Sequence, residues 1–159
     1  MPVDREAAYA ALAARLTKYL GPFLADPQTV LRVPRASTSV DAGEQPMAFV
    51  VATHHVPVIA DPLPARWTLH ATLVLLAKCP EDQSTAETVL NAMIMAAEGA
   101  LQRQSDEDTF SPGQALQTWT TLSGTVLYAQ PAGPVEIELG AQSGQGVAYF
   151  PIQMVMVPT

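Results

Sequence analysis

The residue types best suited to chemistry in this sequence are three histidines, His54, His55 and His70, and a single cysteine, Cys79. Neighbouring residues of a strand point to opposite faces of a sheet, so His54 and His55 cannot bind one metal ion together without distortion. His70 and Cys79 lie at the two ends of an extended stretch and are too far apart to share a site. With no second cysteine, Cys79 can form neither an intramolecular disulfide nor a cysteine zinc site. We therefore expect no bound metal, and histidines that are ordinary strand or loop residues.

The sequence offers no motif for nucleophilic catalysis or for phosphate binding. It contains no Gly-x-Ser-x-Gly elbow, and no serine or cysteine lies in a motif that would activate it. The glycine-rich stretch 140–146 lacks the Gly-Lys-Ser/Thr ending of a P-loop and precedes a strand instead of a helix, which indicates a hairpin loop. We expect a protein that is not an enzyme and that has no catalytic residue and no cofactor.

Two groups of carboxylates could in principle act as acids, bases or cation ligands. Glu136 and Glu138 alternate with apolar residues, which places both on one face of a strand. This spacing is more typical of a solvated strand face. Asp106, Glu107 and Asp108 lack the glycine turn and ligand spacing of a calcium loop, so we interpret them as a solvated acidic loop. A small enzyme or ligand-binding domain that uses a histidine or the Glu136/Glu138 pair is the alternative function.

Length and charge exclude several classes of protein. The chain has 159 residues, of which 48% are hydrophobic and 14% charged, with a net charge of −7; this fits one domain, residues 1–159, with a full core. Residues 1–80 hold seven Lys or Arg and six Asp or Glu, whereas residues 81–159 hold one and nine. Phosphate binding needs clustered cations, so specific nucleic-acid binding is not expected. No apolar run is long enough to cross a bilayer, and the charged N-terminus is unlike a signal peptide, so we expect no membrane association.

Hydrophobic periodicity predicts two helices. The first spans about residues 4–20, with Asp4 as its N-cap and Gly21-Pro22 as its end. The second opens with the capping box Ser84 to Glu87 and runs to about Gln104. The apolar stripe of the first helix consists of Tyr9, Leu12, Leu16, Tyr19 and Leu20, followed by Phe23, while Arg5, Arg15 and Lys18 fall mostly off it.

Most of the remaining chain is predicted to form strands joined by loops. Trp67–Lys78 is the longest candidate. Its odd-numbered residues form a wholly apolar face and its other face is mixed, which fits a sheet covered by helices on one side. Pro151, inside the last strand, predicts an edge position or a bulge there. Further extended segments are expected at 29–33, 47–56, 116–122, 125–130, 135–139 and 147–157, and loops at 35–45, 57–66 and 105–114.

The order helix, strands, helix, strands predicts an α+β domain. Two helices of about 17–20 residues can cover one face of a mixed, mainly antiparallel β-sheet of about four to six strands. This arrangement buries the apolar stripes of both helices against the apolar face of the sheet.

The proline-rich loop before Trp67 is composed like an element that contacts another protein. Pro57, Pro62 and Pro64 stiffen the loop, and it ends in Arg66 and Trp67, residue types that are common at the centres of interfaces. We predict a subunit or partner interface at these residues. The alternative is that Trp67 simply anchors the strand that follows.

Taken in order, these segments resemble the tail terminator proteins of long-tailed bacteriophages, a family also called tail completion or minor tail proteins. The similar stretches are REAAYAALAARL at 5–16, EQPMAFVV at 44–51, LPARWTLHATLVLLA at 63–77, LNAMIMAAEGAL at 90–101, GPVEIELG at 133–140 and GQGVAYFPIQMVMV at 144–157. The likeness covers nearly the whole chain. It lies in the order of elements and in short apolar signatures, not in a catalytic constellation.

The resemblance implies a structural virion protein. Such proteins assemble, usually as hexameric rings, on the last ring of the tail tube, where they stop polymerisation and present a surface to the neck of the filled head. The expected partners are other copies of the chain, the tail tube protein and a neck or head-completion protein, with DNA only passing non-specifically through the lumen. The expected location is the head-proximal end of the tail in the virion, and the host cytoplasm during assembly. A head-closure or neck connector protein is the alternative within the same class.

The charge distribution suggests which surface would line such a channel. An acidic lumen repels phosphate and lets DNA slide instead of sticking. The acidic second half of the chain is therefore a candidate for the channel wall, with Asp106, Glu107, Asp108, Glu136 and Glu138 as the predicted lining. A ring protomer also meets two neighbours through a heterologous contact that closes by rotation, and scarce surface charge suits such contacts.

Overall fold

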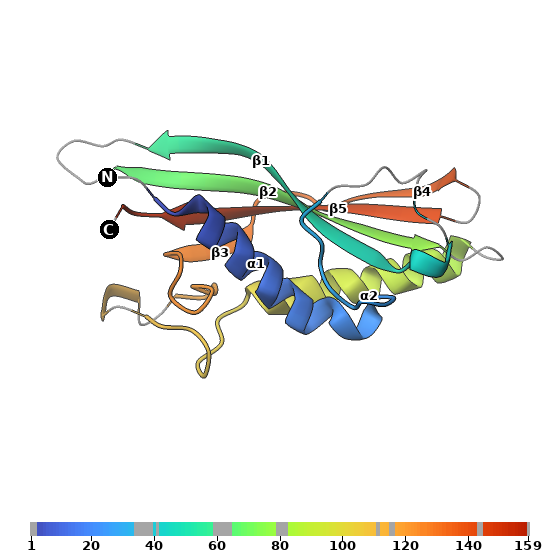
Figure 1. The fold of residues 1–159 in the computed structure, drawn as a ribbon, viewed down its shortest axis with the longest axis horizontal. Helices are drawn as coiled ribbons and strands as arrows, with labels where there is room; N and C mark the ends of the chain where they lie inside the picture. Colours follow the sequence, from blue (N-terminus) through green and yellow to red (C-terminus); the bar gives the residue numbers. More distant parts are fainter. Residues whose placement is uncertain are drawn as a thin grey trace.

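A computed structural model describes residues 3–33, 40, 42–58, 65–78, 83–110, 112–114, 117–142 and 145–158. The main elements are α1 (Arg5–Leu20), β1 (Met47–Val58), β2 (Arg66–Lys78), α2 (Gln83–Leu101), β3 (Tyr128–Pro131), β4 (Glu136–Gln142) and β5 (Gln145–Met156). The five strands form one antiparallel sheet in the order β1-β2-β5-β3, and β4 also pairs with β5. Both helices lie on one face of this sheet (Figure 1), which confirms the predicted α+β fold.

The main core lies between the sheet and the two helices. The face of β2 that carries Leu69, Leu73 and Leu75 is buried against the helices, as its alternation predicts. Fully burying such a side chain contributes about 1.5–3 kcal/mol, so this strand is central to stability. The helix residues of the same cluster include Tyr9, Leu12, Leu16 and Leu20 of α1 and Leu90, Met93, Ala97 and Leu101 of α2.

Helix α1 begins as predicted and ends earlier than its apolar stripe. The Asp4 side chain accepts a hydrogen bond from the Ala7 amide at 2.9 Å, which confirms the N-cap. After Leu20 the chain tightens into a 3₁₀ turn, Gly21–Phe23, and this change of period turns Phe23 outward, where it is 39% exposed. The predicted core position of Phe23 is therefore wrong.

Helix α2 and the segments around it differ from the prediction in their bounds. The helix begins at Gln83, so Ser84 already lies inside it, and its side chain is outside the described residues. The extended segment expected at 116–122 is reduced to single bridges at Trp119 and Thr120, and its first residue lies outside the described part of the chain. Most of the loop expected at 35–45 is likewise not described; Ala42–Glu44 forms a 3₁₀ turn.

A second, smaller apolar cluster covers one end of the opposite face of the sheet. It contains Val40, Met47, Phe49, Val74, Leu76 and Val147. Beside it, the segment around Leu31 runs along the outer edge of β1: Leu31 donates to the Ala48 carbonyl at 3.0 Å and accepts from the Val50 amide at 2.9 Å. The stretch expected as a strand at 29–33 thus forms one bridge, which covers the edge of β1 only up to Val50.

Strand β1 continues through the proline that was expected to start a loop. Pro57 pairs with Trp67 and Val58 with Arg66, so the loop predicted over 57–66 is shorter at both ends. The predicted start of the loop at Pro57 is wrong because β1 is an outer strand. An outer strand tolerates a proline, since one side of its backbone has no ladder bond to lose. Residues 59–64 lie outside the described part of the chain.

Pro151 lies in β5, the strand between β2 on one side and β3 and β4 on the other. The β2–β5 register passes through Thr72↔Pro151 without a shift, so the predicted edge position or bulge is wrong. The Pro151 carbonyl accepts from the Ala132 amide at 2.9 Å, so this residue faces the side where β3 ends and β4 has not yet begun. Proline has no N–H, and at this position the N–H would point to the gap between the end of β3 and the start of β4. We call this gap the seam; no ladder bond is lost there.

Candidate interaction surface

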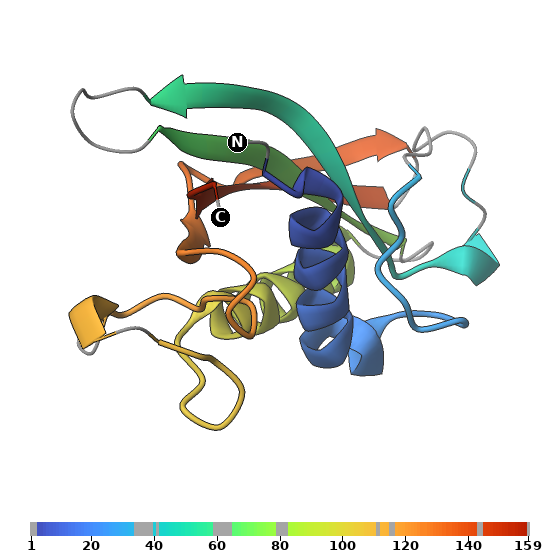
Figure 2. The same ribbon diagram turned by 60° about the vertical axis from the view of Figure 1, so that its left-hand side comes forward.

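One exposed surface lies on a two-stranded arm, defined as residues 52–58 of β1 and 66–70 of β2. All seven β1 residues of the arm are exposed, and Val56 and Val58 are 40% and 48% exposed. Figure 2 shows the arm extending past the N-terminal end of α1 and away from α2. Exposed apolar side chains on an extended strand are typical of a contact surface.

Two aromatic contacts fix the arm to α1. The Tyr9 hydroxyl donates to the His70 carbonyl at 3.2 Å and lies 3.0 Å from His55 Nε2. The Arg5 guanidinium lies over the Trp67 ring, 4.4 Å from its centre, and Trp67 also packs against the main core. Trp67 therefore anchors the arm.

Of the other residues of the predicted interface, Pro57 and Arg66 lie exposed on the arm, whereas Pro62 and Pro64 are outside the described residues. The structure thus places Pro57 and Arg66 on one exposed surface beside the anchored Trp67. Their contact with a partner stays a prediction.

The histidines occupy both faces of the arm. The pairing of β1 with β2 shifts between Ala52 and His54, and beyond this bulge the His54 ring stacks on His70 with 4.1 Å between ring centres. His55 points to the helix face, toward Tyr9, so His54 and His55 lie on opposite faces as predicted. Burial lowers the pKa of His55, with further lowering from Arg5 and His54. Burial and His54 likewise lower the pKa of His70.

The described residues do not form a metal site or a membrane span. Among them, no three His, Cys, Asp or Glu side chains are grouped so that they could hold a metal ion. Cys79 lies outside the described chain. None of the described helices is both long and apolar enough to span a bilayer.

The acidic loop after α2 is not fully solvated, because Asp108 is buried against α1. The Asp108 carboxylate accepts from the Arg15 guanidinium at 2.8 Å, and its side chain is fully buried. It also accepts from the Thr120 hydroxyl at 2.8 Å and from the backbone amides of Gln104 and Ser123 at 2.7 and 3.1 Å. Burial alone would raise the pKa of Asp108, but these hydrogen bonds outweigh it and the pKa is lowered.

Arg15, predicted to lie off the apolar stripe, is 5% exposed and is the centre of this network. Its guanidinium also donates to the Thr120 hydroxyl at 2.7 Å. Glu107 lies 3.5 Å from Arg15 and forms an ion pair with Lys18, and Asp106 is exposed. The solvated-loop interpretation therefore holds for Asp106 and is wrong for Asp108, whose carboxylate has no exposed surface to offer to a channel.

Glu136 and Glu138 lie exposed on β4, on the face of the sheet that carries no helix. They pair with Tyr149 and Val147 of β5, whose side chains point to that face. Burial, then Glu138 and Glu136, raise the pKa of Tyr149. The acidic loop lies on the helix side of the molecule (Figure 1), so the acids predicted to line a channel are divided between two surfaces.

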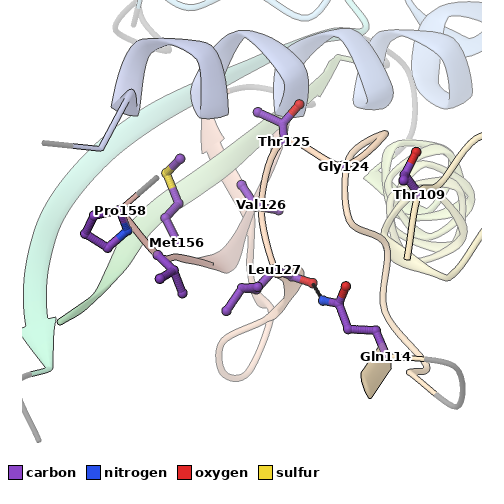
Figure 3. Close-up of a pocket in the computed structure, with 9 residues that line it drawn as sticks. Thr109, Gln114, Gly124, Thr125, Val126, Leu127, Met156 and Pro158 are labelled. Atoms are coloured by element: carbon purple, nitrogen blue, oxygen red, sulfur yellow. Dashed lines mark hydrogen bonds between the residues drawn. The ribbon is translucent and has the colours of Figure 1, made fainter. Parts of the chain in front are cut away.

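A hollow of about 410 Å³ lies between the segment 124–127 and the end of β5 (Figure 3). Its lining includes Thr109, Val126, Met156 and Pro158, and the Gln114 side chain donates to the Leu127 carbonyl at 2.9 Å at its rim. The residues that line it carry no ionisable side chain, so the hollow offers packing and neutral hydrogen bonds but no acid–base group.

The molecule is thus a two-layer α+β domain with a projecting arm and an acidic strand on its helix-free face. Its sequence matches no protein-family model and no curated protein. Its structure is similar to a chain in the virion of a native gene transfer agent particle, with a TM-score of 0.51, 10% sequence identity and coverage of 94% of both chains. The likeness extends over nearly the full length of both chains and shows that they share a fold.

Proposed function

We propose that this protein is a structural component of a phage-like virion and acts as a tail terminator. In this role it forms a ring, a hexamer by the likeness of its sequence to that family, which caps the tail tube, ends its polymerisation and joins the tail to the neck. The observation that carries the proposal is the fold shared over 94% of both chains with a chain of a gene transfer agent virion. The role is structural and needs no catalytic residue and no cofactor.

The exposed surfaces support an assembly role. The arm presents Val56 and Val58, and β4 presents Ile137 and Leu139 at 40% and 41% exposure, at separate places on the same sheet. A protein that joins neighbours on two sides needs two different surfaces of this kind.

The helix-free face is the surface we assign to the channel. It carries Glu136 and Glu138, whereas the acids of the other group are paired with α1 or lie beyond the helices. Two exposed carboxylates per subunit would repeat around a ring and repel the phosphates of passing DNA. Binding of the tube protein and of a neck protein would then fall to the two rims of the ring.

A tube-capping assay tests this function. Purified tube protein is polymerised with and without this chain, and tube lengths and tube ends are measured by electron microscopy. We expect arrested growth and additional ring density at one end of each tube. Unchanged lengths with bare ends would overturn the proposal, and binding to a head connector in place of the tube would favour the neck protein.

A further inference from the structure

The outer edges of the sheet are covered along part of their length. The segment around Leu31 covers the beginning of the β1 edge, up to Val50. On the opposite side, the Ala129 amide of β3 donates to the Thr120 carbonyl at 2.9 Å, so the outer edge of β3 is covered as well. In the described chain, two edge segments have no strand or loop beside them: residues 51–58 of β1 and Glu136–Gln142 of β4.

These two open edges are compatible in direction. The path from β1 through β2 and β5 to β4 contains only antiparallel neighbours, so β1 and β4 run in opposite directions. A β4 strand placed against the β1 strand of a second copy therefore continues the antiparallel alternation of the sheet. Such a contact joins two different surfaces, leaves one open edge at each end, and repeats from copy to copy.

The positions of the open edges along the sheet also suit a closed ring. β4 pairs with residues 145–149 of β5, which pair in turn with residues 74–78 of β2, whereas the open part of β1 pairs with residues 66–72 at the opposite end of β2. Successive copies would be staggered along the strand direction. A stagger of this kind, with tilted strands, is what closing a sheet into a barrel requires.

Charge on the helix-free face is complementary between the two edges. β4 carries the exposed carboxylates of Glu136 and Glu138. The open segment of β1 has no acidic residue, and the exposed cation Arg66 lies beside it on β2, on the helix-free face. Opposite charges on facing strands favour this pairing, whereas two copies joined through the same β4 edge would oppose like charges.

Apolar side chains are also left exposed at both edges. Ile137 and Leu139 of β4 point to the helix face, and Val56 and Val58 of β1 point to the helix-free face. Soluble proteins blunt open edges with charge, proline or cover, and Pro57 confines the hydrogen bonding of the open β1 edge to the residues before it. Here the apolar residues at the two edges would gain burial when the edges pair.

We propose that the open β4 edge of one copy pairs, in antiparallel fashion, with residues 51–58 of β1 in the next copy. The occupant of each edge is thus a second copy of this chain, and the sheet continues from subunit to subunit. This inference deepens the proposed function, on which it rests for the closed ring.

The hydrogen-bonding directions identify where each edge can be blocked. The Val50 amide points to the open side of β1, where it bonds Leu31, so the amide of Ala52, two residues further, points the same way. On β4, Glu136 and Glu138 pair with Tyr149 and Val147 of β5, whose backbone hydrogen-bonding groups point toward β4. The backbone amide of Ile137, which lies between the two glutamates, therefore points to the open side of β4. Ala52→Pro and Ile137→Pro each remove an N–H from an open edge without removing a bond within the sheet.

The test compares these two variants alone and mixed, by sedimentation velocity and mass photometry. We expect each variant alone to associate roughly tenfold or more weakly than the unmodified chain, since one edge is blocked. An equimolar mixture retains one open edge of each kind and should form a one-to-one dimer and nothing larger. The chain carrying both substitutions should remain a monomer in every mixture.

Matched controls separate edge blocking from misfolding. Ala52→Val and Ile137→Val keep the N–H and should associate like the unmodified chain, and circular dichroism with thermal unfolding checks each fold. Should a proline variant fail to fold, Glu136→Lys with Glu138→Lys provides a second test. These exposed substitutions should weaken association, and a partner carrying Arg66→Glu should restore it.

Three results would overturn the inference: folded proline variants that associate like the unmodified chain, folded variants that stay monomeric when mixed, or an unmodified chain that stays monomeric at millimolar concentration. The tube-capping assay is read separately. A chain that caps tubes but shows none of this edge pairing keeps the proposed function and loses the inference.

Discussion

At the scale of single residues, the Arg15–Asp108 ion pair is the interaction on which the packing of the loop after α2 most depends. Both side chains are buried, and the two residues are 93 positions apart in the sequence. Removing one partner of a buried ion pair leaves the other charged group without compensation. We expect Arg15→Met to lower the free energy of unfolding by about 3–5 kcal/mol, measured by urea denaturation.

Lys18 is the matched control, because it contacts Glu107 of the same loop but its side chain is 60% exposed. An exposed ion pair contributes about 0–1 kcal/mol, so Lys18→Met should have a small effect. Equal losses for the two variants would show that burial is not what gives the Arg15 pair its importance.

Asp108 should also make stability depend on pH in the acid range. Its pKa is lowered in the folded protein from the ordinary value of 3.8, because the hydrogen bonds from Arg15, Gln104, Thr120 and Ser123 outweigh its burial. A lowered folded pKa means that the contribution is fully present above the ordinary value and is lost as the pH falls through the folded value.

The measurement is the melting temperature of the unmodified chain and of Asp108→Asn between pH 6 and pH 2. The unmodified chain should lose stability more steeply below about pH 4 than the variant, which has no carboxylate to protonate at this position. Parallel curves would contradict this assignment.

The burial of Arg15 was predictable in part. On a helical wheel of about 100° per residue, Arg15 lies about 40° from Tyr19, which borders the apolar stripe. The sequence therefore allowed a buried position for Arg15 but did not reveal its partner. Asp108 lies in a loop distant in sequence, and only the folded chain brings that loop against α1.

At the scale of elements, the tight packing of α2 on the end of β5 depends on Gly146. A Cβ atom at this position would lie 2.7 Å from Leu90 Cδ1 and 3.1 Å from Leu139 Cδ2. Overpacking of a filled core costs about 1–3 kcal/mol, so Gly146→Ala should lower the free energy of unfolding by this amount, measured by urea denaturation.

Gly133 offers the comparison, since a Cβ there would meet Pro151 Cγ at an ordinary 3.6 Å. Gly133→Ala should change stability by less than about 0.5 kcal/mol. A similar loss in both variants would point to the backbone conformation of glycine as the cause, and not to crowding at Leu90.

The strands show which sequence patterns were sufficient. The apolar face of β2 was predicted because strict alternation over a long strand has one simple explanation, a sheet covered on one side. The two prolines were misjudged because their effect depends on where neighbouring strands end. Pro57 is tolerated because β1 is an outer strand, and Pro151 because it faces the gap between β3 and β4. Neither fact can be read from the residues adjacent to the proline in the sequence.

At the scale of the whole molecule, element order was enough to predict two helices on one face of an antiparallel sheet, because few layered arrangements bury all the apolar faces. The candidate surfaces were less accessible to sequence reasoning. Glu136 and Glu138 were correctly placed together on one strand face, but their separation from Asp106–Asp108 follows from the three-dimensional fold. Both groups are acidic, yet the strand lies in the sheet and the loop lies on the helix side.

The seam at Pro151 divides the sheet into parts that can open separately. β3 and β4 each bond to β5 but not to one another, and among the described residues none covers the outer edge of β4, whereas β3 is covered. In native-state hydrogen exchange with increasing denaturant, we expect β4 amides to exchange by a local opening well below the global free energy and β3 amides only near it. One common opening energy for both would contradict this. A protomer could then release its acidic strand and reseat it while the rest of the domain stays folded, so that joining and leaving an assembly would not require unfolding.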